Sequence, residues 1–325
     1  MKSFSPTEIA EMFERELANL QLADEPQQLY APIRYTMAEG GKRMRPTMTA
    51  LAYNMYNDNL QNVWAAALAI EIFHNFTLLH DDIMDNAAMR RGRESVYAKW
   101  GTNVAILSGD VMLIEAYHLL QNVDKEHLTK VLSLFNTMAT QVCEGQQYDM
   151  DFEQRDRVSV AEYVQMIELK TAALLAGAVA IGATLADAPE EDCQKLFRFA
   201  TEVGLAFQIQ DDLLDSYGDD RLGKKIGGDI LEGKQTYLMI TALSNANEEE
   251  REILRKTHLR DDINDATKIE IIRTLYDKLD IPNRAERQIE VRIARALSIL
   301  ETLSIPSERT QQMQDYVIGL VGRKH

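Results

Sequence analysis

Two short acidic motifs of identical spacing are the residues of this chain best suited to chemistry. Both read Asp-Asp-x-x-Asp, and their carboxylates belong to Asp81, Asp82, Asp85, Asp211, Asp212 and Asp215. Each motif follows apolar sequence, where carboxylates are costly to bury unless a cation compensates them. Residues four apart share a helix face, so the first and last Asp of each motif line up. Two such acidic faces, set opposite each other, would hold divalent metal.

The spacing alone is a weak signal, because it arises by chance in roughly one chain of this size in ten. A third copy at residues 261–265 follows charged residues and opens a polar helical stretch. Acidic residues there simply suit the N-terminus of a helix. We therefore expect the third copy to be structural. The apolar residues before the other two copies set those apart.

The ligand types favour Mg²⁺ over Zn²⁺, because they are hard oxygens and the chain has only two Cys and six His. Mg²⁺ usually keeps part of its coordination shell for water and substrate phosphates, so a phosphorylated ligand is implied. The net charge of −16 argues against nucleic acid and anionic membranes as partners. The same negative charge would also repel a phosphorylated ligand. A bound metal ion removes this repulsion, because it bridges carboxylate to phosphate.

Local basic clusters could bind a second phosphate without metal. Lys42, Arg43 and Arg45 follow the pair Gly40-Gly41 at a helix start, where backbone N–H groups also favour an anion. Further cations beside or near Gly, Thr or Gln are Arg90, Arg91, Arg93, Lys170, Lys224, Lys225 and Lys234. Each of these, taken singly, is equally explained as a solvated surface charge.

The rest of the chain predicts an all-α protein with one large domain, residues 1–325. Its 325 residues, 46% of them hydrophobic, suffice for a large core, and residues 47–188 lack proline. Apolar residues recur at helical spacing nearly everywhere, without the alternating runs and hairpin turns of strands. No composition shift or low-complexity linker divides the chain.

The sequence also predicts a cytoplasmic protein without stable membrane insertion. The uncharged run 171–186 is shorter than the roughly 20 apolar residues needed to span a bilayer, so we expect a buried core helix. Residues 1–20 are charged and amphipathic, without the hydrophobic region of a signal peptide. Cys143 and Cys193 are expected to be free thiols in a reducing compartment.

The order of these motifs resembles the trans-type isoprenyl diphosphate synthases of the polyprenyl synthetase family, which include farnesyl and geranylgeranyl diphosphate synthases. Over residues 30–240 the chain shows in sequence Gly-Gly-Lys-Arg-x-Arg-Pro, Glu-x-x-His, His-Asp-Asp-x-x-Asp, Arg-Arg-Gly, Gly-Gln, Lys-Thr, Gln-x-x-Asp-Asp-x-x-Asp and Gly-Lys. The resemblance implies a single all-helical bundle of the isoprenoid synthase type with a central cavity. It also implies a homodimer.

Carried over residue by residue, the resemblance assigns Asp81 and Asp85 to two Mg²⁺ ions and Asp211, with Asp215 as a further candidate, to a third. Mn²⁺ is a substitute that such a site would accept, and Asp82 and Asp212 complete the two metal-binding motifs. The allylic diphosphate would be bound by Arg90, Lys170, Lys225 and Lys234, and isopentenyl diphosphate by Lys42, Arg45, His74 and Arg91. Thr171 and Gln208 would face the developing cation, and Gln146 falls in the Gly-Gln motif.

One departure lies directly after Arg-Arg-Gly. Many relatives read x-Pro-Thr there, whereas this chain has Arg93-Glu94-Ser95, which leaves the shape of the local loop open. The C-terminal Arg323-Lys324 either covers the site, as in some relatives, or is a frayed charged tail.

The implied reaction joins isopentenyl diphosphate head to tail to an allylic diphosphate and releases pyrophosphate. The allylic C–O bond breaks first, and the residues expected to stabilise the charges are Asp81, Asp85, Arg90, Lys170, Gln208, Asp211 and Lys225. The double bond of isopentenyl diphosphate then attacks the cation, and the departing pyrophosphate takes the proton. No side-chain nucleophile and no dedicated general base are needed.

Product length should depend on the helix turn before the first acidic motif. Phe76 and Thr77 precede Asp81 by five and four residues, so Phe76 sits about 7 Å along the helix from the metal site, with Phe73 one turn further. In the family an aromatic residue at the fifth position, which Phe76 occupies here, accompanies short products. Thr77, at the fourth position, is not aromatic, which favours geranylgeranyl diphosphate over farnesyl diphosphate. The alternative is that Phe73 and Phe76 are only core packing.

Three rival functions remain open at this point. A terpene cyclase also uses an Asp-rich helix, but its second motif normally carries Ser or Thr and Glu where this chain has Asp215 and Asp219. His80-Asp81 matches the dyad of helical metal phosphohydrolases, although His74 lies on a different helix face. An inactive subunit that binds prenyl diphosphates is the third, and assay of the purified protein alone decides it.

Overall fold

Several of the helices begin where a short polar side chain caps them. The computed structural model describes residues 2–218 and 226–321. Ser5 and Ser159 each form a capping box with the Glu three residues later, and Asn247 does the same with Glu250. Each such pair satisfies two backbone N–H groups that a helix start leaves without partners. Local sequence thus fixes these boundaries before any tertiary packing is considered.

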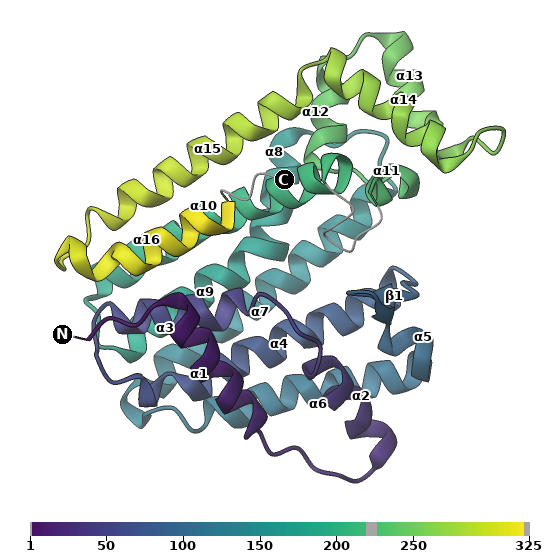
Figure 1. Cartoon of the computed structure of the whole chain (residues 1–325). Coiled ribbons are helices and arrows are strands. Elements are labelled where there is room, and N and C mark those ends of the chain that lie inside the picture. The colour runs from purple at the N-terminus through teal and green to yellow at the C-terminus, as the bar shows by residue number, and fades with distance from the viewer. Residues whose placement is uncertain (1, 219–225, 322–325) are drawn as a thin grey trace. The chain divides into compact units, whose positions relative to one another are not determined.

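The described residues fall into two compact units. The first comprises residues 2–137, 174–197 and 300–316, and the second comprises the remainder. Helices α7 (Lys125–Glu153), α10 (Glu190–Tyr217) and α16 (Ser307–Val321) contribute residues to both. Figure 1 shows the course of the chain through these helices. The single-domain assignment stays a prediction.

The first unit is built around α4, which packs against α6 and α3. Its elements are α1 (Pro6–Ala18), α2 (Gln27–Met37), α3 (Met44–Asn54), the 3₁₀ turn η1 (Leu60–Asn62), α4 (Trp64–Met84), β1 (Met89–Arg90), β2 (Arg93–Glu94), α5 (Val96–Trp100), α6 (Thr102–Leu120) and most of α9 (Ala173–Leu185). Ile9 and Phe13 of α1 are fully buried, which confirms the amphipathic N-terminal helix. Gly109 of α6 lets the ring of His80 approach, since a Cβ there would lie 2.2 Å from His80 Nε2.

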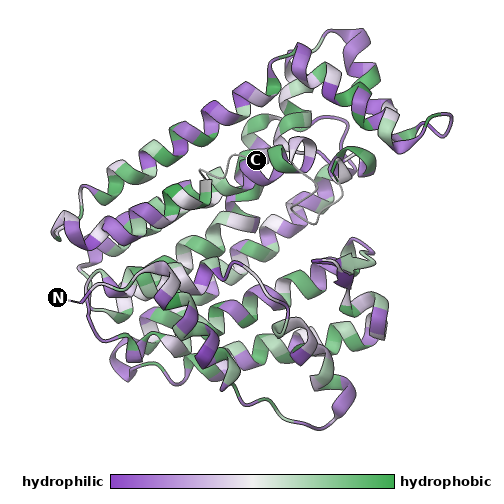
Figure 2. Ribbon diagram, in the orientation of Figure 1, coloured by the Kyte–Doolittle hydropathy of each residue, from purple (hydrophilic) through white to green (hydrophobic). Residues whose placement is uncertain are grey.

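The second unit surrounds α12 (Tyr237–Asn245). Its other elements are α8 (Val160–Ile167), the π-helical turn η2 (Glu168–Ala172), α11 (Gly228–Glu232), α13 (Glu248–Lys256), the 3₁₀ turn η4 (Thr257–Leu259), α14 (Asp265–Lys278) and α15 (Ile281–Leu300). A hydrophobic core here includes Leu238, Ile240, Ile209 and Tyr276. Figure 2 shows hydrophobic and hydrophilic residues interleaved along the long helices, as the helical spacing in the sequence predicts.

The all-α prediction is confirmed. Among the described residues the strands are the two-residue pair β1 and β2, which lie antiparallel with Met89 opposite Glu94. The third acidic motif is structural as expected, because Asn264 caps α14 and Asp262 pairs with Arg260 at 2.5 Å.

Three helical segments are long and apolar enough, by length and composition, to cross a membrane. They are Leu60–Met84, Thr102–Leu120 and Val160–Leu185, and 67%, 33% and 78% of their most apolar stretches are buried inside the protein. The last contains the uncharged run 171–186 nearly entirely, and as a helix of 26 residues it is longer than that run. Its burial agrees with the expected core helix.

Candidate active site

The first acidic motif occupies the C-terminal end of α4. Asp81 and Asp82 lie in its last turn and Asp85 is the C-cap residue, while that turn holds no basic residue. Acidic groups at this end of a helix face the negative pole of the helix dipole, which disfavours them, whereas a nearby cation stabilises them. Asp85 is exposed and Asp81 is partly buried. The motif is therefore placed and charged to receive a cation from solvent.

Asp82 differs from its neighbours because it is 3% exposed and bound to Arg90. Arg90 Nε donates to Asp82 Oδ1 at 2.8 Å, and Arg90 Nη2 lies 3.3 Å from Asp81 Oδ2. Burial raises the pKa of Asp82, and the hydrogen bond and charge of Arg90 oppose that shift. Arg90 thus ties β1 to the acidic end of α4.

Residues 90–93 form a tight hairpin turn that carries Arg91. Arg91 and Gly92 have φ angles of 50° and 77°, the two positive values of a type I′ turn. Arg91 Nη1 donates to Gly40 O at 3.3 Å. This contact brings the arginines of the hairpin next to the basic segment that follows Gly40-Gly41. The open question about the loop after Arg-Arg-Gly is thereby answered, since Ser95 caps α5 and its hydroxyl donates to Ala87 O.

Arg45 and His74 meet directly between α3 and α4. Arg45 Nη1 lies 3.0 Å from His74 Nε2. Burial, followed by the charges of Arg45 and Arg91, holds the pKa of His74 well below its usual value. The neutral imidazole must accept through Nε2, because a guanidinium has no acceptor, so its proton resides on Nδ1. Burial lowers the pKa of Arg45 to about 10.

The guanidinium of Arg45 retains an unsatisfied donor. Its Nε is buried and has no hydrogen-bond partner among residues 2–218 and 226–321. A buried donor of this kind is costly unless something accepts from it. Together with Arg91 and the exposed Lys42, it makes this part of the first unit suited to an anion. Arg43, in contrast, turns away into the core.

The second acidic motif occupies the last two turns of α10, which also lacks a basic residue in its last turn. Asp212 is buried and accepts from Tyr163 Oη at 2.5 Å, Tyr237 N at 2.9 Å and Gln208 Nε2 at 3.0 Å. Burial raises its pKa to about 6 against these three hydrogen bonds. Asp211 and Asp215 are partly buried on the same helix. The middle Asp of each motif is thus buried against protein groups.

Lys170 and Thr171 sit in the π-helical turn η2, a distortion that often marks functional sites. Lys170 Nζ donates to Asp149 Oδ2 at 2.6 Å, and Thr171 Oγ1 donates to Gln208 Oε1 at 3.0 Å. Gly145 of the Gly-Gln motif makes this packing feasible, because a Cβ there would lie 2.2 Å from Lys170 N. Within residues 2–218 and 226–321, the Gln146 side chain makes no hydrogen bond.

Three residues near the second motif were missed by the sequence reasoning. Asp149 pairs with Lys170, Tyr163 donates to Asp212, and Asp229 donates its N–H to Asp215 Oδ2 at 3.0 Å. Burial, then the charge of Asp215, raises the pKa of Asp229 to about 7. Asp149 carried a usable signal, since it lies four residues after Gly145 on one helix face.

Of the remaining predicted residues, some are described by the structure and others lie outside the described residues. Lys234 lies by Glu232, 3.1 Å between Nζ and Oε2, and its charge opposes the rise in the pKa of Asp229. Lys224 and Lys225, with Asp219, Arg323 and Lys324, lie outside the described residues. His80 Nε2 contacts Ile106 O at 3.2 Å, so its ring points at α6, which disfavours the phosphohydrolase dyad.

The aromatic residues before Asp81 differ in their surroundings. Phe73 is 1% exposed and packs against Phe135, with ring centroids 5.2 Å apart. Phe76 is partly buried between Phe73 and His80, at centroid distances of 5.5 and 4.7 Å. Thr77 donates through Oγ1 to His74 O. Phe73 is therefore a core residue, while Phe76 has one side that the protein does not cover.

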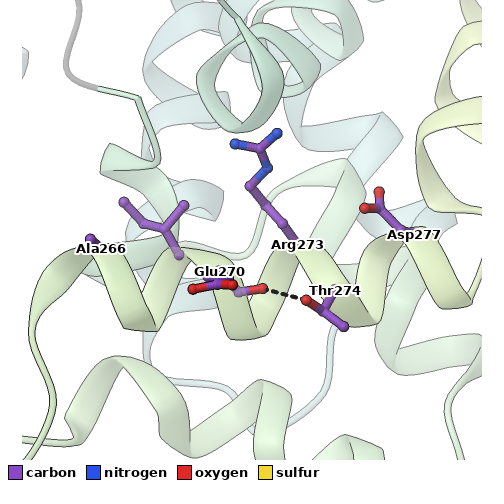
Figure 3. A pocket seen from close by; sticks show the side chains of 6 residues that line it. Ala266, Glu270, Arg273, Thr274 and Asp277 are labelled. Atoms are coloured by element: carbon purple, nitrogen blue, oxygen red, sulfur yellow. Dashed lines mark hydrogen bonds between the residues drawn. The ribbon is translucent and has the colours of Figure 1, made fainter.

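A pocket of about 260 Å³ on α14 lies apart from all these residues in the sequence. Figure 3 shows its lining: Ala266, Ile269, Glu270, Arg273, Thr274 and Asp277. Tyr217 engages its polar groups, since its hydroxyl donates to Asp277 Oδ1 at 2.7 Å and its ring lies 4.7 Å below the Arg273 guanidinium. No acidic-motif residue lines it.

The metal prediction needs a donor set that fits. Among the described residues, no group of three or more Asp, Glu, His or Cys lies close enough to hold an ion by itself. Mg²⁺ does not need such a cage, because it commonly takes one or two carboxylates and completes its shell with water and phosphate oxygens. The paired carboxylates at two negative helix ends fit that requirement.

Comparison with known proteins identifies the family. The polyprenyl synthetase family model matches residues 26–276. A geranylgeranyl diphosphate synthase of Methanosarcina mazei is 43% identical over 220 residues, 67% of this chain and 68% of its own. A geranylfarnesyl diphosphate synthase of Natronomonas pharaonis is 33% identical over 349 residues, covering 100% of both chains.

Solved structures agree with the sequence relatives. A crystal structure of a geranylgeranyl pyrophosphate synthase matches with a TM-score of 0.93 and 40% identity, over 99% of this chain and 100% of its own. The geranylgeranyl pyrophosphate synthase of Corynebacterium glutamicum, complexed with isoprenyl diphosphate and magnesium, matches with a TM-score of 0.86 and 27% identity over 98% of each chain. By family model, by relatives and by fold, this chain belongs to the polyprenyl synthetase family and is a prenyltransferase.

Proposed function

We propose that the enzyme condenses isopentenyl diphosphate with allylic diphosphates in a Mg²⁺-dependent reaction and makes geranylgeranyl diphosphate. The observation that carries the proposal is the placing of each acidic motif at the C-terminal end of a helix, after a largely apolar stretch and without a basic residue in the last turn. Carboxylates in this position can serve as ligands of metal ions, and a bound ion would offset their unfavourable interaction with the helix dipole. Relatives named as geranylgeranyl diphosphate synthases support the product class.

Asp81, Asp85 and Asp211 would hold about three Mg²⁺ ions, with Asp215 as a further ligand. Bound there, the ions would neutralise charge on the leaving pyrophosphate. Asp82 and Asp212 are better suited to orient their neighbours, because Arg90 and Tyr163 already bind them. Mn²⁺, which also accepts carboxylate and water ligands, is the expected substitute.

Isopentenyl diphosphate would bind at Lys42, Arg45, His74 and Arg91. The buried Nε of Arg45 and the Nδ1–H of neutral His74 are donors that a phosphate can satisfy. The allylic diphosphate would be bound by Arg90, Lys170, Lys225 and Lys234. Holding both substrates in fixed orientation replaces a bimolecular encounter and lowers the barrier by several kcal/mol, of the order of 7–11 kcal/mol in the best intramolecular cases.

Thr171 and Gln208 present a hydrogen-bonded polar pair from η2 and α10. Their neutral oxygens can face the allylic cation without removing a proton from it. Proton loss then goes to the departing pyrophosphate, so the reaction needs no dedicated base.

The experiment that tests this proposal measures products by mass spectrometry. Purified enzyme with Mg²⁺ and isopentenyl diphosphate is given a C5, C10 or C15 allylic primer. Each primer should yield the C20 diphosphate and pyrophosphate. Hydrocarbon products would instead indicate a terpene cyclase, and no turnover would indicate a non-catalytic subunit. A C25 product would match the geranylfarnesyl relative and correct the length.

Phe76 is proposed as the residue that stops elongation. It is the partly exposed aromatic residue one turn before Asp81. Phe76→Ala should therefore shift the main product from C20 to C25 or longer, measured as the product distribution with the C15 primer. Ile253→Ala, at an exposed apolar residue of α13 outside the proposed gate, is the control and should leave the length unchanged. An unaltered C20 product from Phe76→Ala would refute the gate.

We further propose a homodimer in the cytoplasm. The face of α6 exposes Ile106, Leu107 and Ile114, and Leu107 is 59% exposed, an unusual amount of apolar surface for one helix. Both cysteines are free, which suits a reducing compartment. Light scattering should give about twice the chain mass of 36.9 kDa. Leu107→Lys should give monomers, and Ile253→Lys, an exposed apolar residue on α13, should not. A monomeric wild-type protein would contradict the dimer.

A further inference from the structure

The hairpin at residues 89–94 needs support from outside. Its turn places Arg91, a residue with a Cβ, at a φ angle of 50°, which is strained for any residue but glycine. Two strands of two residues are not stable alone. The hairpin nevertheless carries Arg90 and Arg91, which we propose to bind the diphosphate groups of the two substrates. Contacts beyond the hairpin must therefore fix it.

The hairpin's contacts on the side of the acidic motif use groups that substrate would need. Arg90 binds Asp82 and Asp81, and Arg91 binds Gly40 O. A phosphate that binds these guanidiniums competes with such contacts. Contacts made through these guanidiniums are therefore weaker anchors for the hairpin once a ligand takes some of the same donors. An anchor that leaves the guanidiniums available is required.

Tyr35 of α2 supplies that anchor. Its hydroxyl donates to Glu94 O at 3.0 Å, and the guanidinium carbon of Arg93 lies 4.0 Å from its ring centroid. Cation–π contacts at such distances are attractive. One side chain thus holds β2 through its backbone and through a cation that has no part in the proposed function.

Helix α5 fixes the Tyr35 ring in turn. The Trp100 ring meets it edge to face at 5.0 Å, and Lys99 Nζ lies 4.3 Å from the Tyr35 centroid. Edge-to-face pairs restrict ring orientation. The Tyr35 ring is therefore in place before substrate arrives.

We propose that Tyr35 is a positioning residue that pre-orients Arg90 and Arg91 for diphosphate binding by clamping the hairpin. The inference rests on the proposed function of the two arginines. Tyr35 itself touches no diphosphate. Its loss should weaken substrate binding by freeing the hairpin, while the chemical step continues once substrate is bound.

The test compares Tyr35→Leu, which removes ring and hydroxyl, with Tyr35→Phe, which keeps the ring. Tyr35→Leu should raise KM for isopentenyl and allylic diphosphates about tenfold, equivalent to about 1.4 kcal/mol, with kcat changed less than about threefold. Tyr35→Phe should raise both KM values by only about threefold. Wild-type KM values in Tyr35→Leu would overturn the proposal.

A second readout does not depend on activity. Trypsin cuts after arginine, so it reports on residues 90–93 directly, and exposed mobile turns are cut preferentially. Tyr35→Leu should be cleaved there about ten times faster than the wild type, with cleavage elsewhere unchanged. Faster cleavage spread over the whole chain would show general destabilisation and overturn the clamp.

Arg91→Ala separates this inference from the proposed function. A rise in its KM for isopentenyl diphosphate, together with a normal KM in Tyr35→Leu, defeats the clamp alone. An unchanged KM in Arg91→Ala defeats the proposed role of the arginine, and the clamp with it.

Discussion

Asp81→Asn should lower kcat/KM about 10²–10³-fold while the protein keeps its fold. Losses of this size are typical when one electrostatic group at a reacting centre is removed. The substitution keeps the side-chain shape and removes the charge that would bind metal. It also removes a negative charge from the negative end of α4, so thermal stability should stay equal or rise. Steady-state kinetics at saturating Mg²⁺, with thermal melting alongside, measures both effects.

The third acidic motif provides the matched control for that experiment. Asp261→Asn changes an exposed Asp of the same sequence pattern in the loop before α14. It should leave kcat/KM at the wild-type value. Activity of Asp81→Asn within about threefold of the wild type would contradict a metal-binding role for the first motif.

Arg43→Met should destabilise the protein by about 3–5 kcal/mol, as is usual when one partner of a buried ion pair is removed. The Arg43 side chain is 5% exposed and pairs with Glu71 at 2.8 Å and Glu14 at 2.7 Å. It also donates to Met37 O at 3.2 Å. Without it the Glu71 carboxylate, 4% exposed, loses its ion-pair partner and keeps only weaker compensation, a hydrogen bond of 3.4 Å from Asn75 Nδ2 and the charge of Arg45. Urea denaturation followed by circular dichroism measures the loss.

Two further variants isolate the cause of that loss. Glu14→Gln removes a partner that is 51% exposed and should cost about 1 kcal/mol or less. Arg43→Met combined with Glu71→Met removes both buried charges and should recover much of the stability lost by the single variant. A double variant no more stable than Arg43→Met would show that packing, and not the buried charge, is what Arg43 supplies.

The sequence predicted what depends on local periodicity. Helical spacing placed Asp81 on an apolar helix, and the charged context of residues 261–265 marked that motif as structural. The structure brings Arg45 and His74 into contact, while their assignment to one subsite stays a prediction. These features follow from residues close in sequence, or from a motif order that a family shares.

The sequence could not predict what depends on tertiary contacts. Arg43 lies in sequence between the phosphate-binding candidates Lys42 and Arg45. Its backbone has a φ angle of 41°, and its side chain points into the core, where it binds Glu71. Tyr163 reaches Asp212 across 49 residues, and Tyr35 reaches Glu94 across 59. No spacing rule connects such pairs, because the packing of separate helices brings them together.

The most direct test of the central claim is a crystal structure of the enzyme with Mg²⁺, isopentenyl diphosphate and a non-hydrolysable allylic diphosphate analogue. Mg²⁺ ions should bridge the analogue's phosphates to the carboxylates of Asp81, Asp85 and Asp211, and the diphosphate of isopentenyl diphosphate should contact Arg45 and Arg91. Ordered analogue bound elsewhere, with these carboxylates holding no ion, would contradict the account.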